Sequence, residues 1–460
     1  GTDIAVPAEA LRPASGWPGG RVILDLIVRD TDTGVTLTWG ATSFSLRKQA
    51  TLDEAKLSDA VYREGDTLRA SVRASGDLGG LAVRFEVHDD LARVLCAQNQ
   101  PAAAEMQFEY RLSHFLGRYA SVATTLVSSQ GAVVDQLRAA PVYVAPAQRR
   151  DREYRASIGF ASIRPYFSAL RQQLLNAGGV QAGTTWTEGV NNGLDIPHSY
   201  FGIYWYRRGP TTKEALERAI EDFQRTGDLD SLAYNTRVEL FRRTKDKRFL
   251  QRNPCFDDPA VVQDLYQRCY ASAQAKARYQ MDYYFVGDEG SLTSYGDEFD
   301  FCWSPHTLAG FREWLKTEHG SLAALNREWN TDFQDWASVV PLTTEEAVAC
   351  GSYAAWADHR TYMEIVFARA YHTARDGVVA ADPEGHIAVS GTQGTTAYNG
   401  CDWYRLDQVI DDFLSYAGGN QWDLHRCFAK PGAMIGFWTG YGSSGLGVQN
   451  AIWNAAIHNV

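Results

Sequence analysis

Seven short apolar runs in the second part of the chain most constrain its fold. Each ends in glycine, aromatic or acidic residues, and helical patterns separate most of them. The runs span 154–160, 180–186, 196–206, 283–286, 386–390, 412–416 and 433–437. Strands that alternate with helices form parallel sheets. Because only a closed barrel gathers all strand ends around one mouth, the pattern predicts an α/β fold of the (β/α)8 TIM-barrel type.

An open, doubly wound sheet is the main alternative to the barrel, but no G-x-G-x-x-G follows the first run and no P-loop is present. No helical pattern separates the second and third runs, and an eighth strand is not seen. The sequence leaves open whether it is a fragment or whether another segment closes the barrel. Helices are predicted over 163–177, 212–225, 238–245, 259–280, 305–319, 322–329, 355–380 and from 446 onward.

The first part of the chain predicts an all-β sandwich. Residues 67–73 and 81–87 alternate apolar and polar side chains, as half-buried strands do, and further strands are expected at 21–28, 119–127 and 133–144. Glycine-containing turns separate the early strands, a pattern typical of immunoglobulin-like sandwiches. A polar segment at 145–152 marks a boundary. We therefore expect an accessory sandwich domain at 1–147 and a barrel domain at 148–460.

Composition excludes several classes of partner. The net charge is −11, so a nucleic-acid partner is not expected. No apolar run approaches the ~20 residues that a membrane helix needs. No signal peptide is visible, although the Gly-Thr start leaves a secreted or periplasmic location open. The seven cysteines form no C-x-x-C pair, so neither a metal site nor a cofactor is expected. A homo-oligomer is compatible with the sequence.

The strongest candidate for chemistry is the stretch 281–290, MDYYFVGDEG. Asp288 and Glu289 follow a buried strand and lie between Gly287 and Gly290. Catalytic groups of barrel enzymes lie at this carboxyl end of the strands. Hydrolysis of a glycosidic bond needs one carboxyl group that protonates the leaving oxygen and a second one across the sugar. Glu289 suits the first role, whereas the alternative is a solvated acidic turn.

The sequence around this doublet resembles the family 42 β-galactosidases, within the clan of retaining (β/α)8 glycosidases. The matching context is Cys302-Trp303-Ser304-Pro305, then FREWL at 311–315, LNREWN at 325–330, Phe333, Trp336 and Asp358-His359-Arg360. The resemblance implies that Glu289 is the general acid/base and that Asp288 stands where the clan usually has Asn. A sandwich placed before the barrel departs from the usual family order.

The second carboxyl group is the main departure from the clan. The resemblance implies a Glu at the end of the seventh strand, but 436–442 reads GFWTGYG. Three explanations remain: another carboxylate serves, the strand count is off by one, or the domain binds glycans without cleaving them. The candidate carboxylates are Glu188, Asp297, Glu298, Asp300, Asp402 and Asp423.

Other residues at the predicted strand ends suit sugar binding, although each equally suits core packing or a surface position. Aromatic rings stack on sugar faces, and polar groups bond to hydroxyl groups. The candidates are Trp186, Glu188, Trp205, Tyr206, Arg207, Trp303, Gln393, Asn420 and Trp438.

These features predict a glycoside hydrolase that acts on a β-linked oligo- or polysaccharide. The alternative is a non-catalytic carbohydrate-binding or scaffold protein on a degenerate glycosidase barrel. An ester or amide hydrolase is disfavoured, because neither a G-x-S-x-G elbow nor a cysteine-protease signature is present.

Overall fold

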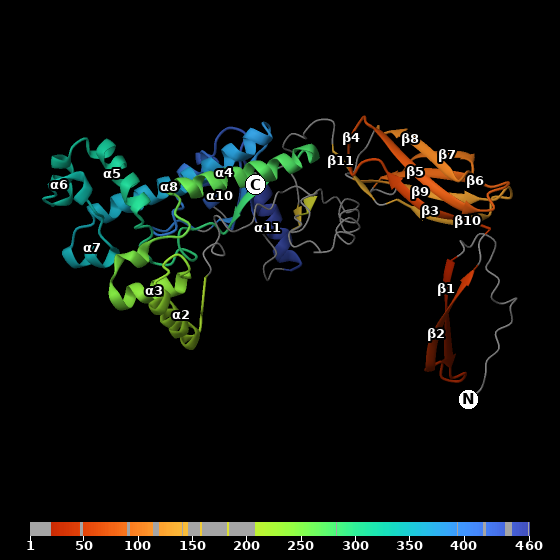
Figure 1. The fold of residues 1–460 in the computed structure, drawn as a ribbon, viewed down its shortest axis with the longest axis horizontal. Coiled ribbons are helices and arrows are strands. Elements are labelled where there is room, and N and C mark those ends of the chain that lie inside the picture. The colour runs from red at the N-terminus through yellow and green to blue at the C-terminus, as the bar shows by residue number, and fades with distance from the viewer. Residues whose placement is uncertain are drawn as a thin grey trace. The chain divides into compact units, whose positions relative to one another are not determined.

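The computed structural model describes residues 20–46, 49–89, 93–113, 119–139, 141–145, 157–158, 182–183, 208–281, 283–392, 394–416, 420–437, 444–458 and 460. Contacts divide the chain into two compact units (Figure 1). Unit 1 comprises Gly1–Val190 with Arg278–Gln280, and unit 2 comprises Asn191–Ala277 with Met281–Val460.

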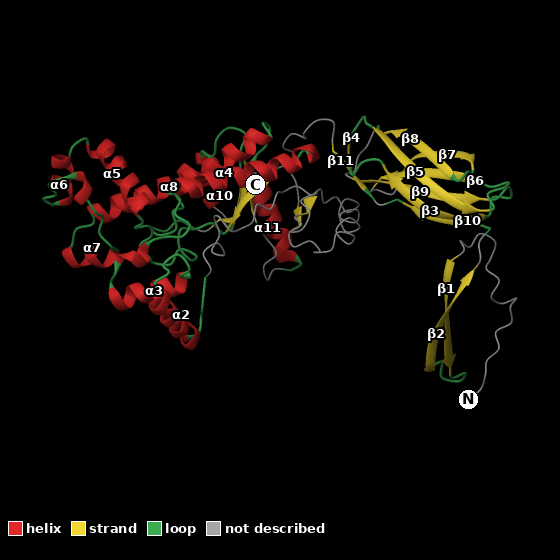
Figure 2. Ribbon diagram, in the orientation of Figure 1, coloured by secondary structure: helices red, strands yellow, loops and turns green. Residues whose placement is uncertain are grey.

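Two of the sheets in unit 1 enclose one apolar core. One sheet has the strand order β4-β11-β9-β6-β7, with β10 also paired to β9, and the other has the order β3-β5-β8. Figure 2 shows these strands as the main content of the unit. The bounds are β3 Ala50–Leu57, β4 Val61–Arg63, β5 Thr67–Gly76, β6 Ala82–Asp89, β7 Val94–Pro101, β8 Glu105–Arg111, β9 Tyr119–Val127, β10 Val133–Arg138 and β11 Val142–Ala145.

Alternation of side chains along the strands builds this core. In β5 and β6, buried apolar residues alternate with less buried ones, as the sequence predicted. Phe85 from one sheet stacks on Phe108 from the other, with ring centroids 5.0 Å apart. The predicted strand at 133–144 is two strands, because β10 ends at Arg138 and β11 begins at Val142.

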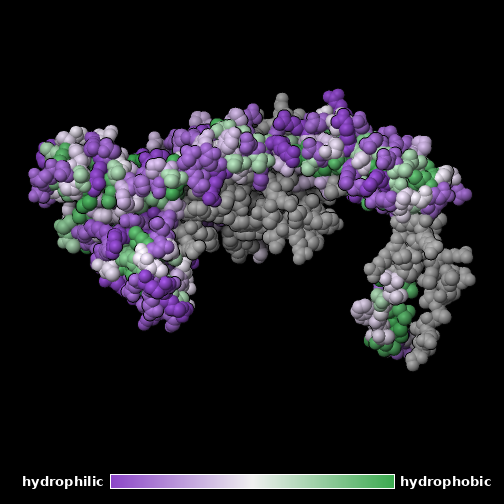
Figure 3. Space-filling view, viewed as in Figure 1, coloured by the Kyte–Doolittle hydropathy of each residue, from purple (hydrophilic) through white to green (hydrophobic). Residues whose placement is uncertain are grey.

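The hairpin of β1 (Gly20–Arg29) and β2 (Thr36–Leu46) forms a sheet of its own. Several of its apolar side chains are exposed, including Ile23, Leu37 and Trp39. Figure 3 shows this apolar surface on the hairpin. The hairpin thus differs from the two sheets, whose apolar residues are buried.

The centre of unit 2 is a parallel sheet in chain order. It consists of β14 (Tyr284–Asp288), β15 (Ile387–Thr392), β16 (Asp412–Ser415) and β17 (Met434–Phe437). These are the fourth to seventh predicted strands. A short parallel pair, β12 (Ser157–Ile158) and β13 (Ala182–Gly183), belongs to unit 1 and occurs where the first two strands were predicted. The third, at 196–206, and the helix at 163–177 lie outside the described residues.

Helices connect the strands of unit 2, and their starts agree with sequence signals. Thr212, Asp258 and Ser304 each cap a helix with the side chain, and proline occupies the first turn after the last two. The predicted helix at 259–280 is shorter, because α4 ends at Lys276 and a 3-10 turn follows. Three short helices, α7, α9 and α10, were not predicted. The bounds are α2 Lys213–Thr226, α3 Tyr234–Thr244, α4 Pro259–Lys276, α5 Pro305–His319, α6 Leu322–Trp329, α7 Thr344–Cys350, α8 Ala354–Ala381, α9 Trp403–Asp407, α10 Asn420–Phe428 and α11 Leu446–Ile457.

The long helix α8 packs along α4 (Figure 1). A Cβ atom added to Gly377 of α8 would lie 2.5 Å from the carbonyl oxygen of Tyr266 in α4. Glycine therefore permits the close approach of these two helices. No helix in the described part of the chain is long and apolar enough to cross a membrane.

Candidate active site

The candidate site begins where β14 ends. Asp288 is the last residue of this strand, and Glu289 follows it; both are half-buried. Glu289 has a backbone φ of +50°, in the left-handed region that few residues other than glycine adopt. Strained backbone of this kind is concentrated at functional sites.

Two neighbouring strands bring further groups to the same place. Tyr416, directly after β16, donates a hydrogen bond from its hydroxyl group to Oε1 of Glu289, at 2.8 Å. Gly391 of β15 has φ +62°, and a Cβ atom there would lie 2.8 Å from both Oδ1 of Asp288 and the hydroxyl oxygen of Tyr416. Three successive strand ends therefore meet at one point. The Tyr416 side chain is 39% exposed, so solvent reaches it.

The loops after β14 and β15 pack against each other beside these strand ends. The amide of Leu292 donates to the carbonyl oxygen of Asn399 at 2.9 Å, and the thiol of Cys401 lies 3.6 Å from the carbonyl oxygen of Gly290. These contacts hold the chain that follows Glu289.

The Asp358-His359-Arg360 motif in α8 anchors the same loop. Arg360 donates to the carbonyl oxygen of Phe301 at 2.8 Å, and Nε2 of His359 lies 3.1 Å from the carbonyl oxygen of Cys302. Asp358 accepts a hydrogen bond from the indole of Trp329 at 2.8 Å. Residues on which the family resemblance depends thus stabilise the loop that follows β14.

Half-buried carboxyl groups lie next to the packed loops. Burial, together with the charge of Asp402, raises the pKa of Glu364 in α8 to about 7. Burial also raises the pKa of Tyr371 well above its usual value, and the charges of Cys401 and Asp288 add to the effect. The sequence analysis did not select Glu364. A helical pattern does not show which loop packs over a given residue of the helix.

The structure places three of the candidate second carboxylates with other partners. Asp300 accepts hydrogen bonds from the amide and hydroxyl groups of Thr344. Asp402 caps α9 and pairs with Arg405. Asp423 pairs with Arg426 and His458. Asp297 and Glu298 are exposed in the loop after β14, and Glu188 lies outside the described residues.

Most of the residues predicted to contact sugar lie outside the described residues. Trp303 is described: it is buried, and the Lys247 ammonium group lies 4.3 Å from its ring centroid. Asn420 begins α10, but its side chain is not described. The remaining candidates lie outside the described residues, namely Trp186, Glu188, Trp205, Tyr206, Arg207, Gln393 and Trp438.

The sequence reasoning did not select Tyr416, although a signal was present. This residue ends the sixth predicted strand at 412–416. Other aromatic residues at predicted strand ends are candidate sugar contacts for the same reason. Among the residues that the structure describes, no group of three His, Cys, Asp or Glu side chains is placed to hold a metal ion.

Several solved structures are similar to this chain. A β-galactosidase from Bacillus circulans sp. alkalophilus is 15% identical with a TM-score of 0.38, and the match covers 59% of this chain and 42% of that one. A β-galactosidase from Rahnella sp. R3 is 17% identical with a TM-score of 0.30, covering 35% and 23%. The catalytic domain of a β-amylase from Paenibacillus polymyxa is 16% identical with a TM-score of 0.41, covering 66% and 90%. The chain thus spans less than half the length of these two galactosidases.

Sequence comparison locates the resemblance in the chain. No curated protein matches the sequence. The model of glycoside hydrolase family 42, described as beta-galactosidase, matches residues 278–417. This segment contains β14, β15 and β16 together with Glu289, Gly391 and Tyr416. The predicted resemblance to the family 42 β-galactosidases is therefore confirmed over residues 278–417.

Proposed function

We propose that this protein is a glycoside hydrolase that acts on a β-linked glycan, with Glu289 as its general acid/base. One observation carries the proposal: within the segment similar to family 42, the Glu289 carboxylate lies at a strand end and accepts a hydrogen bond from Tyr416. The corresponding architecture is a (β/α)8 barrel at 148–460 that follows a β-sandwich domain at 1–147. The parallel order of β14 to β17 supports the barrel.

Glu289 would donate its proton to the glycosidic oxygen as the bond to the leaving group breaks. The hydrogen bond from Tyr416 engages Oε1, so Oε2 is the oxygen that would transfer the proton. Asp288 lies beside it as a second catalytic candidate. Trp186, Glu188, Trp205, Tyr206, Arg207, Trp303, Gln393, Asn420 and Trp438 are proposed as substrate contacts.

The second carboxyl group decides between two mechanisms. A partner about 5–5.5 Å from Glu289 would act as a nucleophile with retention, whereas one about 6.5–9.5 Å away would activate water with inversion. Neither β17 nor the residues that follow it, up to 442, contain Asp or Glu. This absence favours the second candidate function, a protein that binds glycans without cleaving them.

Hydrolysis of aryl β-galactosides with poor and good leaving groups tests the proposal. We expect Glu289→Gln to lower kcat/KM about 10²–10⁴-fold for the poor leaving group, which needs protonation. The loss for a dinitrophenyl galactoside should be smaller, because that leaving group departs without a proton. Glu318→Gln, at an exposed position in α5, is the matched control and should behave like the wild type.

Two outcomes would contradict the proposal. Equal activity of Glu289→Gln and the wild type on the poor leaving group would remove Glu289 from the acid role. Binding of β-linked oligosaccharides in calorimetry, without turnover by the wild type, would establish the binding protein instead.

A further inference from the structure

Two buried cysteines from distant parts of the sequence lie on adjacent segments of unit 2. Cys255 precedes α4 and is 7% exposed, and Cys302 precedes α5 and is 1% exposed. Their segments are adjacent, because the amide of Arg252 donates a hydrogen bond to Sγ of Cys302 and Sγ of Cys255 lies within hydrogen-bond distance of Oγ of Ser304. Both are free thiols, as are the other five cysteines.

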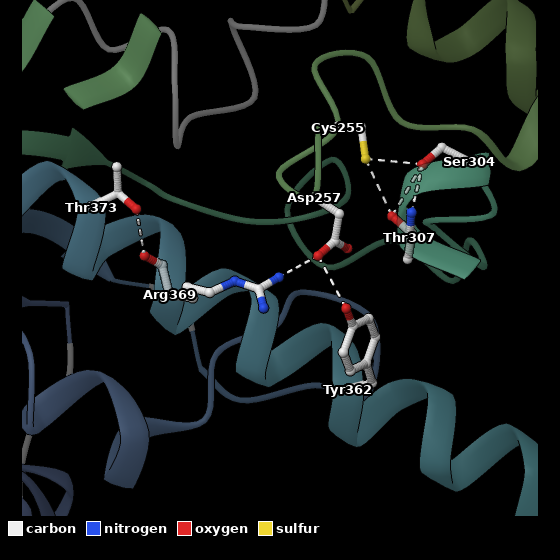
Figure 4. Close-up of polar contacts among 7 residues, drawn as sticks. All are labelled: Cys255, Asp257, Ser304, Thr307, Tyr362, Arg369 and Thr373. Carbon is white, nitrogen blue, oxygen red and sulfur yellow. Dashed lines mark hydrogen bonds and ion pairs between the residues drawn. The ribbon is translucent and has the colours of Figure 1, made fainter. Parts of the chain in front are cut away.

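Hydrogen bonds hold the two segments side by side. The amide of Arg252 donates to Sγ of Cys302 at 3.2 Å, and the amide of Trp303 donates to the carbonyl oxygen of Leu250 at 2.9 Å. Sγ of Cys255 lies 2.9 Å from Oγ of Ser304 and 3.2 Å from Oγ1 of Thr307 (Figure 4). A backbone amide thus holds the sulfur of Cys302, and two side-chain hydroxyl groups hold that of Cys255.

A second set of contacts fixes the Cys255 segment to α8. Asp257 accepts a hydrogen bond from the hydroxyl group of Tyr362 at 3.0 Å and pairs with Arg369 (Figure 4). Because α8 also anchors the Cys302 loop through His359 and Arg360, one helix holds both cysteine segments.

The surrounding polar groups shift the pKa values of the two thiols in opposite directions, so that Cys302 is the nucleophile and Cys255 the proton donor. Burial acts to raise the pKa of Cys302, but hydrogen bonds from Cys255, Thr307 and the amides of Arg252 and Ser304 outweigh it and bring the pKa to about 6. The hydrogen bond to Cys302, together with burial, raises the pKa of Cys255. A thiolate held on a segment next to that of a thiol is an arrangement from which a disulfide can form on oxidation.

We propose that Cys255 and Cys302 are a redox-active dithiol that closes to an intramolecular disulfide. The bond would join the two ends of the segment 255–302, which contains α4, β14 and Glu289. Oxidation would thus tie together the chain on either side of the candidate acid. Cys269, buried within α4, would remain a thiol.

The step balances with hydrogen peroxide as the oxidant. The Cys302 thiolate attacks one peroxide oxygen, the O–O bond breaks, hydroxide leaves, and Cys302 becomes a sulfenic acid. The sulfur of Cys255 then attacks the sulfur of Cys302. The S–S bond forms, the S–O bond breaks, and the oxygen leaves as water with the proton of Cys255. Two electrons pass from the two sulfur atoms to the peroxide.

Peptide mapping of the full chain tests the proposal. Reduced protein, with and without a small excess of hydrogen peroxide at pH 7, is denatured in iodoacetamide and cut with trypsin without further reduction. Cleavage after Lys and Arg separates Cys255, Cys269 and Cys302 into the peptides 253–268, 269–276 and 279–312. We expect peroxide to yield a cross-linked pair of the first and third peptides, two hydrogen atoms lighter than their sum, while Cys269 stays alkylated.

Variants and a second readout separate the cross-link from unspecific oxidation. Cys302→Ser should abolish the linked pair and leave Cys255 alkylated, whereas Cys269→Ser should retain the pair. The oxidised wild type should show a higher thermal midpoint that dithiothreitol reverses, because closing a long loop restricts the unfolded chain. Equal alkylation of Cys255 and Cys302 before and after peroxide in the wild type would overturn the proposal, as would over-oxidation of Cys302 with Cys255 still a thiol.

Discussion

At the scale of single residues, Glu289 has an unfavourable backbone conformation and a specific side-chain contact. A non-glycine residue in the left-handed region raises the free energy of the fold by about 1–3 kcal/mol, which the surroundings must offset. The Tyr416 hydroxyl group donates to its carboxylate from the end of β16. The position of the proposed acid thus depends on a second strand.

Replacing Tyr416 with Phe tests this dependence, given the proposed activity. Hydrogen bonds to charged groups contribute about 1.5–3 kcal/mol, so we expect kcat/KM to fall about 10- to 100-fold with little change in thermal midpoint. Tyr404→Phe, at an exposed position in α9, is the control and should keep full activity. Unchanged kinetics of Tyr416→Phe would show that the hydrogen bond does not position Glu289.

Gly391 is the other residue on which this geometry depends. Alanine there would adopt a positive φ and place its Cβ atom 2.8 Å from Oδ1 of Asp288. We expect Gly391→Ala to lower the free energy of unfolding by about 1–3 kcal/mol, measured by urea denaturation. Gly394→Ala, where a Cβ atom meets nothing within 4 Å, should leave the stability nearly unchanged. Equal midpoints for the two variants would argue against the close packing of the strand ends.

At the scale of elements, α8 connects the parts of unit 2. It packs along α4 and anchors the loop after β14 through His359 and Arg360. Asp257 and Arg369 join it to the segment before α4. A change between α4 and α8 should therefore affect the whole unit.

Gly377→Ala tests the packing of these helices. In an exposed helix, replacing Gly with Ala stabilises by about 1 kcal/mol. At Gly377 the added Cβ atom would lie 2.5 Å from the carbonyl oxygen of Tyr266 and 2.9 Å from Cβ of Cys269. We expect a loss of about 1–3 kcal/mol in the free energy of unfolding. Gly447→Ala in α11, where the space is open, should be neutral or stabilising; a gain at Gly377 would mean that the helices are further apart.

For the molecule as a whole, the half-buried carboxyl group of Glu364 links the free energy of unfolding to pH. The folded state raises the pKa of Glu364 from 4.5 to about 7, mainly through burial and then through the charge of Asp402, with Arg405 and Arg360 opposing. The folded protein therefore binds this proton more tightly than the unfolded chain does. The contribution is present below about pH 4.5 and is lost as the pH rises through about 7.

Glu364→Gln should remove this part of the pH dependence. We expect the variant to be more stable than the wild type at pH 8 by about 1–2 kcal/mol, after allowance for solvent screening of a half-buried group, and similar to it at pH 4.5. Urea unfolding at both pH values measures the difference, and Glu318→Gln should follow the wild type. A difference that does not change with pH would contradict the assignment.

Local patterns predicted most described elements because their causes are local. Ser304 and Pro305 mark the start of α5, and the run 283–286 predicts β14, since capping and burial depend on neighbouring residues. The short helices α7, α9 and α10 were missed because one or two turns carry little periodicity. Glu289 was found through its strand and its family resemblance, whereas Tyr416, Gly391 and Glu364 were not selected.

The parallel strands β14 to β17, the helices α5, α6 and α8, and the resemblance to family 42 around Asp288 and Glu289 can be predicted from the sequence alone. Apolar periodicity, capping residues and motif spacing act over a few residues, so they can be read along the chain. The fold alone shows that Tyr416 donates a hydrogen bond to Glu289, that the charge of Asp402 acts on Glu364 and that the segments of Cys255 and Cys302 are adjacent. These pairs are joined by packing between distant segments, and a linear pattern contains no distance between such segments.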